Sequence, residues 1–198
     1  MTELVSHLDE HESTGIDNRK FAMWAFLSSE FLLFGALITN YLLFKGIEFE
    51  ARPIPSELYD IPFTSVSSFV LLMSSLTMVL AHDSLERSDQ AGARTWLLAT
   101  AGLGMVFISG QVFEFTEFVQ QGMKMTTNPA ASSFYLLTGF HGTHVLIGII
   151  MLLSLFFISR RQGGLSTERG MNVELVGLYW HFVDIVWIVI FTVVYLIP

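Results

Sequence analysis

The chain has 198 residues, of which 52% are hydrophobic and 14% charged, and its mean hydropathy is +0.56. Average soluble domains are about 25% charged, so this composition excludes an ordinary soluble protein and indicates an integral membrane protein. The formal net charge of −8 argues against a nucleic-acid partner, because duplex binding depends on Lys and Arg, and the lack of cysteine excludes disulfides, iron–sulfur clusters and thiolate-bound copper.

The first 20 residues are acidic and polar. They contain neither an apolar run nor the cationic start of a secretory signal, so we expect a solvated cytoplasmic tail. Five apolar runs follow, each close to the length of about 20 residues that a helix needs to cross a hydrocarbon core. We therefore predict an all-α fold, a polytopic membrane protein whose residues 21–198 form a bundle of five transmembrane helices. The expected spans are residues 21–44, 63–81, 95–119, 132–158 and 173–197.

The basic residues predict the orientation of the bundle, because cytoplasmic loops keep an excess of Lys and Arg. With five spans, the side of the N-terminus collects most of them, so we expect the N-terminus in the cytoplasm and the C-terminus outside. That side holds Arg19, Lys20, Arg87, Arg94, Arg160, Arg161 and Arg169, and the other side holds Lys45, Arg52 and Lys124.

Small residues on the later spans predict close helix packing, since membrane helices associate where small side chains let their backbones approach. The fourth span has two pairs spaced i to i+4, and the third span offers a similar set. They are Thr138 with Gly142, Gly139 with Thr143, and Gly102 with Gly110.

Ionisable side chains within the spans are functional candidates, because each costs several kcal/mol in hydrocarbon unless it is paired or wetted. Their depth follows from the rise of 1.5 Å per residue, which places one set near the membrane centre and another nearer the span ends. The central set is Glu30, His141, His144, His181 and Asp184, and the secondary polar sites are His82, Gln111 and Glu114.

The spacing of these residues predicts a structural polar seam with no metal. Residues three apart share a helix face, which pairs His141 with His144 and His181 with Asp184. We expect His181 to bond Asp184 and to reach the histidine pair or Glu30. The alternatives are a haem held by His144 and His181, or a di-iron site, for which the ligands are too few. Glu30 has apolar neighbours on its own face, so it is a neutral proton-handling group, a lipid contact or a bond to another helix.

Two longer motifs resemble a known family. Residues 138–148 contain Phe-His-Gly-Thr-His-Val followed by a glycine, which is similar to the FHGxHVxxG signature of subunit III of haem-copper terminal oxidases, and residues 179–187 are similar to its YWHFVDxVW signature. Shorter and weaker similarities to the family sequence pattern occur at Ser29-Glu30, Ala81-His82, Gln111 and Glu114-Phe115. The resemblance is to the five-helix bacterial form of the cytochrome c oxidase and ubiquinol oxidase subunit III family, and it covers about residues 20 to 197.

This resemblance implies an accessory subunit of a proton-pumping oxidase of aerobic respiration in the bacterial inner (plasma) membrane. Such a subunit binds no haem or copper, which belong to its partner subunits, and packs against the catalytic subunit I and other oxidase subunits. The family glutamate matching Glu30 lies beside a lipid-filled cleft, so we expect Glu30 to help hold phospholipid and sustain proton uptake. Two departures stand out: the longer members have two additional helices at the start, and Asp83 replaces a frequent second histidine next to His82.

Other functions remain alternatives at this stage. Glu30, where quinol oxidases often carry Asp, favours cytochrome c oxidase over a ubiquinol oxidase or a homologue associated with nitric oxide reductases. Outside the family, a small proton transporter would use Glu30 and Asp184 as a relay, although the sequence has no inverted repeat. A membrane b-type cytochrome would use His144 and His181. The sequence shows no nucleophile with a neighbouring base, so it does not indicate a catalytic centre in the chain itself.

Overall fold

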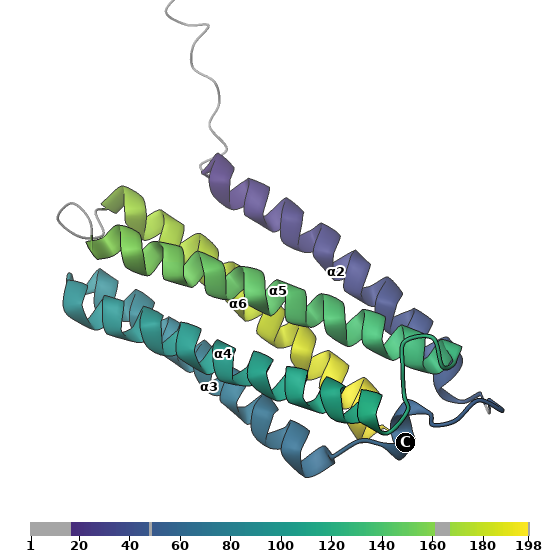
Figure 1. The fold of residues 1–198 in the computed structure, drawn as a ribbon. Helices are drawn as coiled ribbons and strands as arrows, with labels where there is room; N and C mark the ends of the chain where they lie inside the picture. The colour runs from purple at the N-terminus through teal and green to yellow at the C-terminus, as the bar shows by residue number, and fades with distance from the viewer. Residues whose placement is uncertain (1–16, 48, 161–166, 198) are drawn as a thin grey trace, which may run out of the picture.

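The computed structural model describes residues 17–47, 49–160 and 167–197. Five long helices lie side by side (Figure 1), and all five are long and apolar enough to cross a membrane, which confirms the predicted fold class. The predicted acidic tail falls almost wholly outside the described residues. The helices are α2 (Asn18–Lys45), α3 (Ile61–Glu86), α4 (Gln90–Gln120), α5 (Pro129–Arg160) and α6 (Thr167–Phe191), with a short 3₁₀ helix η1 (Pro55–Glu57) and a π-helical end η2 (Thr192–Leu196).

Polar caps set where four of these helices begin. Asp17, Asp60, Asp89 and Asn128 each accept a hydrogen bond from a backbone N–H two or three positions later, at 2.7 to 3.1 Å. Such caps satisfy N–H groups that have no partner within the helix. The helices therefore extend past the apolar runs, and the second one covers Ile61–Glu86 rather than only residues 63–81.

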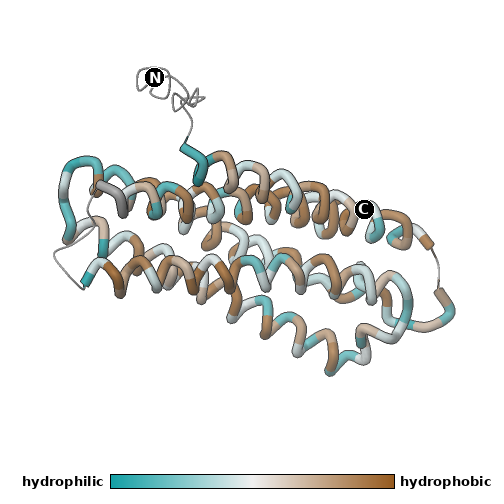
Figure 2. Tube along the Cα trace, turned by 90° about the horizontal axis from the view of Figure 1, so that it is seen from above, coloured by the Kyte–Doolittle hydropathy of each residue, from teal (hydrophilic) through white to brown (hydrophobic). Residues whose placement is uncertain are grey.

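The helix α6 lies at the centre of the bundle and α2 at its edge. Half of an 18-residue apolar stretch within Gly170–Leu196 is buried, against 11% of such a stretch in α2. In Figure 1, α2 lies over α5 and α6, whereas α3 and α4 run side by side on the far side. Figure 2 shows brown, apolar colouring along the middle of the helices and teal mainly at their ends, as expected for helices that cross a bilayer.

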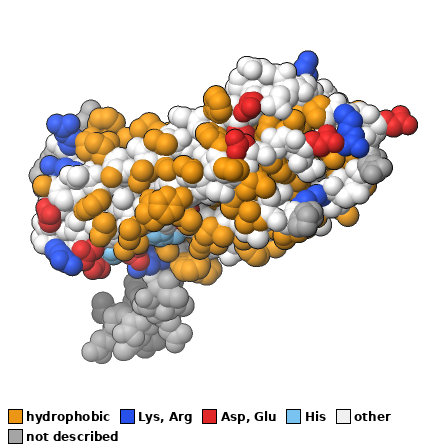
Figure 3. Space-filling model, turned by 90° about the horizontal axis from the view of Figure 1, so that it is seen from below, with side chains coloured by type: hydrophobic (Ala, Val, Ile, Leu, Met, Phe, Trp, Pro, Cys, Tyr) orange, Lys and Arg blue, Asp and Glu red, His pale blue; other side chains and the backbone are white. Residues whose placement is uncertain are grey.

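The two ends of the bundle differ in their side chains. We call the end where α2 and α6 begin the basic end, because of its arginines and lysines, and the opposite one the tyrosine end. Figure 3 shows charged side chains gathered mostly toward the two ends of one face, with hydrophobic side chains between them. The described basic residues of the basic end are Arg19, Lys20, Arg87, Arg94 and Arg160, while the side chains of Arg161 and Arg169 lie outside the described residues.

At the tyrosine end, aromatic and basic side chains connect α2 and α6. The hydroxyls of Tyr41 and Tyr59 lie 2.9 Å apart, and the ring of Tyr59 lies 4.5 Å from that of Tyr195. Burial raises the pKa of the Tyr59 hydroxyl well above its ordinary value, so this group stays neutral. Lys45 donates to the carbonyls of Val193 and Ile197, which lie in the last turn of the chain. These contacts fix the end of α6 against α2.

Trp180 joins four helices at the centre of the bundle. This α6 side chain is 1% exposed, and its Nε1 donates to Ser74 Oγ of α3 at 3.0 Å. Its ring lies against the backbones of Gly104 on α4 and Gly148 on α5. A Cβ added at these glycines would lie 2.6 and 2.7 Å from ring carbons, so the close approach requires glycine at both positions.

The predicted small-residue contacts form only in part. A Cβ at Gly142 would lie 2.5 Å from Gln111 Oε1, so this edge of α5 packs tightly on α4, and one at Gly110 would lie 3.0 Å from Ser67 Oγ of α3. The prediction is wrong for Gly139 and Gly102, since no described atom outside their own helix turn lies within 4 Å of the added Cβ. Spacing alone does not show which of two adjacent helix edges meets a neighbour.

Candidate functional site: the polar residues between the helices

The predicted polar residues fall into separate groups instead of one seam. Glu30 meets His144 between α2 and α5, whereas His181 meets Ser75 between α6 and α3. Glu114 lies nearer the tyrosine end and bonds Thr64. Each group occupies its own helix interface, so the bundle is joined by polar contacts at several places.

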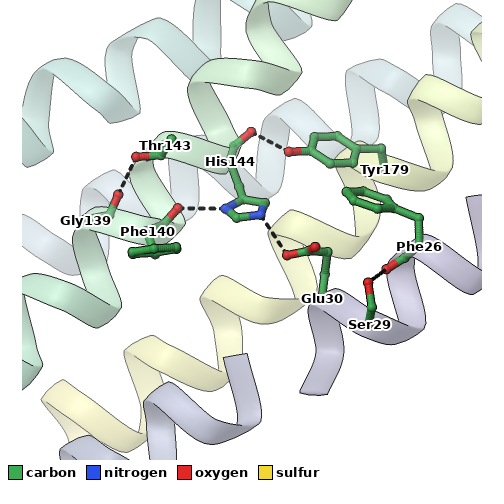
Figure 4. A network of polar contacts seen from close by, with 8 residues as sticks. All are labelled: Phe26, Ser29, Glu30, Gly139, Phe140, Thr143, His144 and Tyr179. Atoms are coloured by element: carbon green, nitrogen blue, oxygen red, sulfur yellow. Dashed lines mark hydrogen bonds and ion pairs between the residues drawn. The ribbon is translucent and has the colours of Figure 1, made fainter. Parts of the chain in front are cut away.

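The first group is a pair of oppositely ionisable side chains. His144 Nε2 lies 3.1 Å from Glu30 Oε2, and the side chains are 12% and 15% exposed (Figure 4). The ring of Phe34 lies 5.1 Å from the imidazole, and Tyr179 of α6 donates its hydroxyl to the backbone carbonyl of His144 at 3.0 Å. Glu30 therefore has its partner on α5, where its own helix face offers none. The pair connects α2 to the two most buried helices.

The geometry of this pair explains how it can lie within a membrane. His144 Nδ1 is 2.8 Å from the carbonyl of Phe140, which can only accept, so Nδ1 carries a hydrogen. One further proton then lies between Nε2 and the Glu30 carboxyl. If it is on the carboxyl, both groups are neutral, and if it is on the imidazole, they form an ion pair. The net charge is zero in both forms, which avoids an uncompensated charge in hydrocarbon.

The second group corrects the expected bond between His181 and Asp184. Within the described residues no hydrogen bond joins these two side chains. Instead, His181 Nδ1 lies 2.6 Å from Ser75 Oγ of α3, and the same hydroxyl faces the Asp184 carboxyl. Residues three apart on a helix point in directions that differ by about 60°, so a hydroxyl on the neighbouring helix can serve both. We call His181, Ser75 and Asp184 the Ser75 group.

His141 is buried without a polar partner in the described part of the chain. It is 0% exposed, and neither of its ring nitrogens has a hydrogen bond. The ring stacks on Trp187 of α6 at 4.8 Å and meets the edge of Phe107 of α4 at 5.9 Å. The predicted pairing of His141 with His144 is therefore not seen, because one imidazole turns toward α4 and α6 and the other toward α2.

The third group lies toward the tyrosine end and includes Glu114, which is 5% exposed. Its two oxygens accept from Thr64 Oγ1 of α3 at 2.9 Å and from the hydroxyl of Tyr195 at 3.3 Å. One turn away, Gln111 donates its Nε2 to the carbonyl of Thr138 on α5 at 2.7 Å. These contacts hold α4 against α3, α5 and the end of α6.

A polar pocket of about 440 Å³ opens between α3 and α6 at the basic end. His82 lies in its wall with Glu86, whose carboxyl is 3.7 Å from His82 Nδ1. Asp83, the residue that departs from the family pattern, forms an ion pair with Arg87 at 3.0 Å. His181 forms the inner wall, so the pocket touches the Ser75 group.

No described set of three or more His, Asp or Glu side chains is close enough to hold a metal ion within residues 17–47, 49–160 and 167–197. Both ring nitrogens of His144 have protein partners, and His181 turns to α3. The two histidines that a haem would require are thus committed to different helix interfaces.

Some members of these groups were not predicted from the sequence. Ser75 and Thr64 were missed because hydroxyl side chains are common in membrane helices, where they often bond only to their own backbone. A signal did exist, since the second span is rich in serine and threonine. Those that bond a side chain of another helix are Thr64, Ser68, Ser74, Ser75 and Thr77.

The sequence matches the family described as cytochrome c oxidase subunit III over residues 3–197. The chain belongs to the cytochrome c oxidase subunit III family. It is 36% identical over 193 residues to the cytochrome c oxidase subunit 3 of Thermostichus vulcanus, which covers 98% of this chain and 92% of that protein. It is 38% identical over 179 residues to that of Bacillus sp. strain PS3, covering 90% and 86%.

Members named for quinol oxidases are equally similar. The chain is 36% identical over 194 residues to a protein of Staphylococcus saprophyticus named "Probable quinol oxidase subunit 3", with 94% of this chain and 96% of that protein covered.

The two motifs that carried the family resemblance pack against each other in the structure. Gly148 of the first lies against Trp180 of the second, and Tyr179 donates to His144.

Proposed function

We propose that the chain is the non-catalytic accessory subunit III of a proton-pumping haem-copper terminal oxidase of aerobic respiration, bound to subunit I and the other oxidase subunits. The observation that carries this proposal is the family match over nearly the whole chain. The described structure supports it, because the buried polar residues bond one another across helices and form a scaffold. The complex is an oxidoreductase that reduces dioxygen and translocates protons, and its haem and copper belong to partner subunits.

We propose cytochrome c as the electron donor of the complex. The second candidate is a quinol, which would make the complex a quinol oxidase. Glu30 supports the first, since quinol oxidases often carry Asp at the matching position. The similar relatives carry both names at comparable identity, so the donor does not follow from them. Electron transfer takes place in other subunits, and a spectrum of the complex with each donor would identify it.

A lipid-binding role is supported by an apolar groove between α2 and α6, with a volume of about 530 Å³. Lipid tails fit such a surface because it offers hydrocarbon contacts along one membrane leaflet. It is lined by Trp24, Leu27, Ser28, Phe31, Leu32, Leu178, Phe182 and Ile185, and by His181, which also lines the polar pocket between α3 and α6. We propose that an acyl chain of a phospholipid occupies this groove, and that the Glu30–His144 pair, on the other edge of α2, holds α2 in the position that forms it.

Glu30→Gln and Glu30→Ala together test this part of the proposal. The amide of Gln can still donate to His144 Nε2, so the Glu30→Gln complex should keep its subunits and most of its lipid, whereas Glu30→Ala removes the contact and should lose lipid. The activity of the variant complex that loses lipid should decline faster during turnover than that of the unmodified complex, with the haem spectrum unchanged. The measurement is phosphorus per haem in the purified complex, followed by sustained oxygen consumption. Full lipid content and sustained activity in both variants would reduce Glu30 to an ordinary helix contact.

For localisation, we propose the bacterial cell membrane with the basic end in the cytoplasm. The basic residues support this orientation, as the cytoplasmic side of membrane proteins is enriched in Lys and Arg. Because the chain has no cysteine, single cysteines report cleanly. In intact cells, an impermeant thiol reagent should label Thr126→Cys and leave Ser88→Cys unlabelled. Labelling of Ser88→Cys alone would reverse the orientation.

The assembly itself is tested by purifying the chain through an affinity tag from mild-detergent extracts of its native membranes. A catalytic subunit that contains haem should copurify in a fixed ratio, and the complex should consume oxygen with a suitable donor. Recovery of the chain alone, or with a complex that contains no haem, would contradict the proposal.

A further inference from the structure

The polar pocket between α3 and α6 leads from the basic end into the bundle. Glu86 and Glu174 lie near its mouth, and His181 lies at its inner wall. His181 follows Glu174 by seven residues of α6, which corresponds to roughly 10 Å along the helix axis. The pocket therefore reaches from the aqueous side toward the partly buried Ser75 group.

The charged groups around the pocket have partners of their own. Within the described residues, His181 bonds the hydroxyl of Ser75 on α3, and the same hydroxyl faces the Asp184 carboxyl of α6. On the α2 side, Lys20 pairs with Glu174 of the pocket. The pairs are Glu174 with Lys20 at 2.7 Å, Asp83 with Arg87 at 3.0 Å, and His82 with Glu86 at 3.7 Å.

Polar atoms at the inner end of the pocket still need hydrogen-bond partners. Ser75 occupies His181 Nδ1 at 2.6 Å, and the described residues offer none to Nε2. Asp184 is 5% exposed, and its Oδ1 also has no partner in the described part of the chain. Buried polar atoms are almost always satisfied by protein or by ordered water, and this pocket is polar and large enough for water.

We propose that the pocket is a water-filled inlet through which protons from the aqueous phase at the basic end reach the Ser75 group. Water delivers a proton to His181 Nε2, the hydrogen on Nδ1 passes to Ser75 Oγ, and the hydrogen of that hydroxyl passes to the Asp184 carboxylate. One proton enters and one arrives. Ser75 is again a neutral hydroxyl, and His181 is again a neutral imidazole, but its hydrogen now lies on Nε2 instead of Nδ1.

This inlet is separate from the Glu30–His144 pair, which lies between α2 and α5 and does not line the pocket. The physiological use of this inlet rests on the proposed role of the chain in proton uptake. The existence of the inlet requires only that the chain is inserted in the membrane. Failure of the inlet is therefore distinguishable from failure of the oxidase assignment, which is followed by haem content in the same samples.

The first test is the water accessibility of single cysteines in the assembled complex, in vesicles that expose the basic end. Met78 lines the pocket, whereas Leu80 lies nearer the end of α3 but does not line it. Thiols react as thiolates, which require water, so Met78→Cys should be labelled by an impermeant reagent at least about tenfold faster than Leu80→Cys. If Met78→Cys fails to assemble, Val79→Cys, which also lines the pocket, replaces it. Equal rates would overturn the inlet.

The second test follows the proton. An infrared carboxyl band that disappears in Asp184→Asn should titrate with the pH of the medium, over the range in which the haem spectrum shows an intact complex. Gly177 also lines the pocket, and a Cβ there would lie 3.2 Å from Met78 Cε, so Gly177→Val should narrow the inlet and slow hydrogen–deuterium exchange at Asp184 severalfold. Gly102→Val, which faces open space, should leave exchange unchanged. An Asp184 carboxyl that neither titrates nor exchanges would overturn the relay.

Discussion

The contact of Trp180 with two glycines predicts a large effect from the smallest possible side-chain addition. Alanine at Gly104 or Gly148 would place a Cβ 2.6 or 2.7 Å from the indole ring, which is about 0.8 or 0.7 Å short of the ordinary contact limit of 3.4 Å. The ring cannot move away freely, because the other glycine and the bond to Ser74 hold it. Overpacking of this kind costs about 1–3 kcal/mol, and loss of the indole hydrogen bond would add about 1 kcal/mol.

The assay is the temperature at which the chain leaves the purified complex, compared among single variants. Gly104→Ala and Gly148→Ala should each lower it by several degrees. Gly102→Ala is the matched control on α4, because its added methyl meets open space and alanine favours a helix by about 1 kcal/mol in water. The effect should be partly relieved in a Gly148→Ala/Trp180→Phe double variant, since the smaller ring makes room. Equal stability of the three alanine variants, or full additivity of the double variant, would refute the reasoning.

Two further predictions concern hydroxyl groups in the other polar groups. Tyr195→Phe removes one of the two donors to the buried Glu114 carboxyl, and should cost about 1–3 kcal/mol of stability in the same dissociation assay; no change would mean that Thr64 alone satisfies the carboxyl. Ser75→Ala deprives the half-buried His181 and the buried Asp184 of a partner and should be at least as costly, whereas Ser109→Ala, on an exposed hydroxyl that bonds only its own helix, should be neutral. Similar effects of the two serine variants would contradict the role given to the Ser75 group.

The general architecture could be predicted from the sequence because the bilayer imposes a length on each apolar run. The five runs correspond to the five helices, and the polar caps at Asp60 and Asp89 explain why the helices extend beyond them. The family also followed from two motifs that lie within single helices. Both features are local in the sequence, so they need no knowledge of how the helices pack.

The partners of the polar residues could not be predicted in the same way. The i, i+3 rule placed His141 with His144 and His181 with Asp184. Instead, His144 and His181 have partners on other helices, Glu30 and Ser75, and His141 has no hydrogen bond within the described residues. Which helix lies opposite a given face depends on packing, and in this bundle that is set by features such as the glycines around Trp180. The serines and threonines of the second span indicate that hydroxyl groups are available, but not which of them faces an imidazole.

The central claim is that the chain supports a haem-containing oxidase without carrying a redox cofactor. Its most direct test is to dissociate the purified complex into this chain and the remaining subunits, and to record the absorption spectrum of each fraction. The account predicts that the Soret band stays entirely with the remaining subunits, at the same intensity as in the intact complex. A Soret band in the fraction of the isolated chain, in proportion to its amount, would contradict the account.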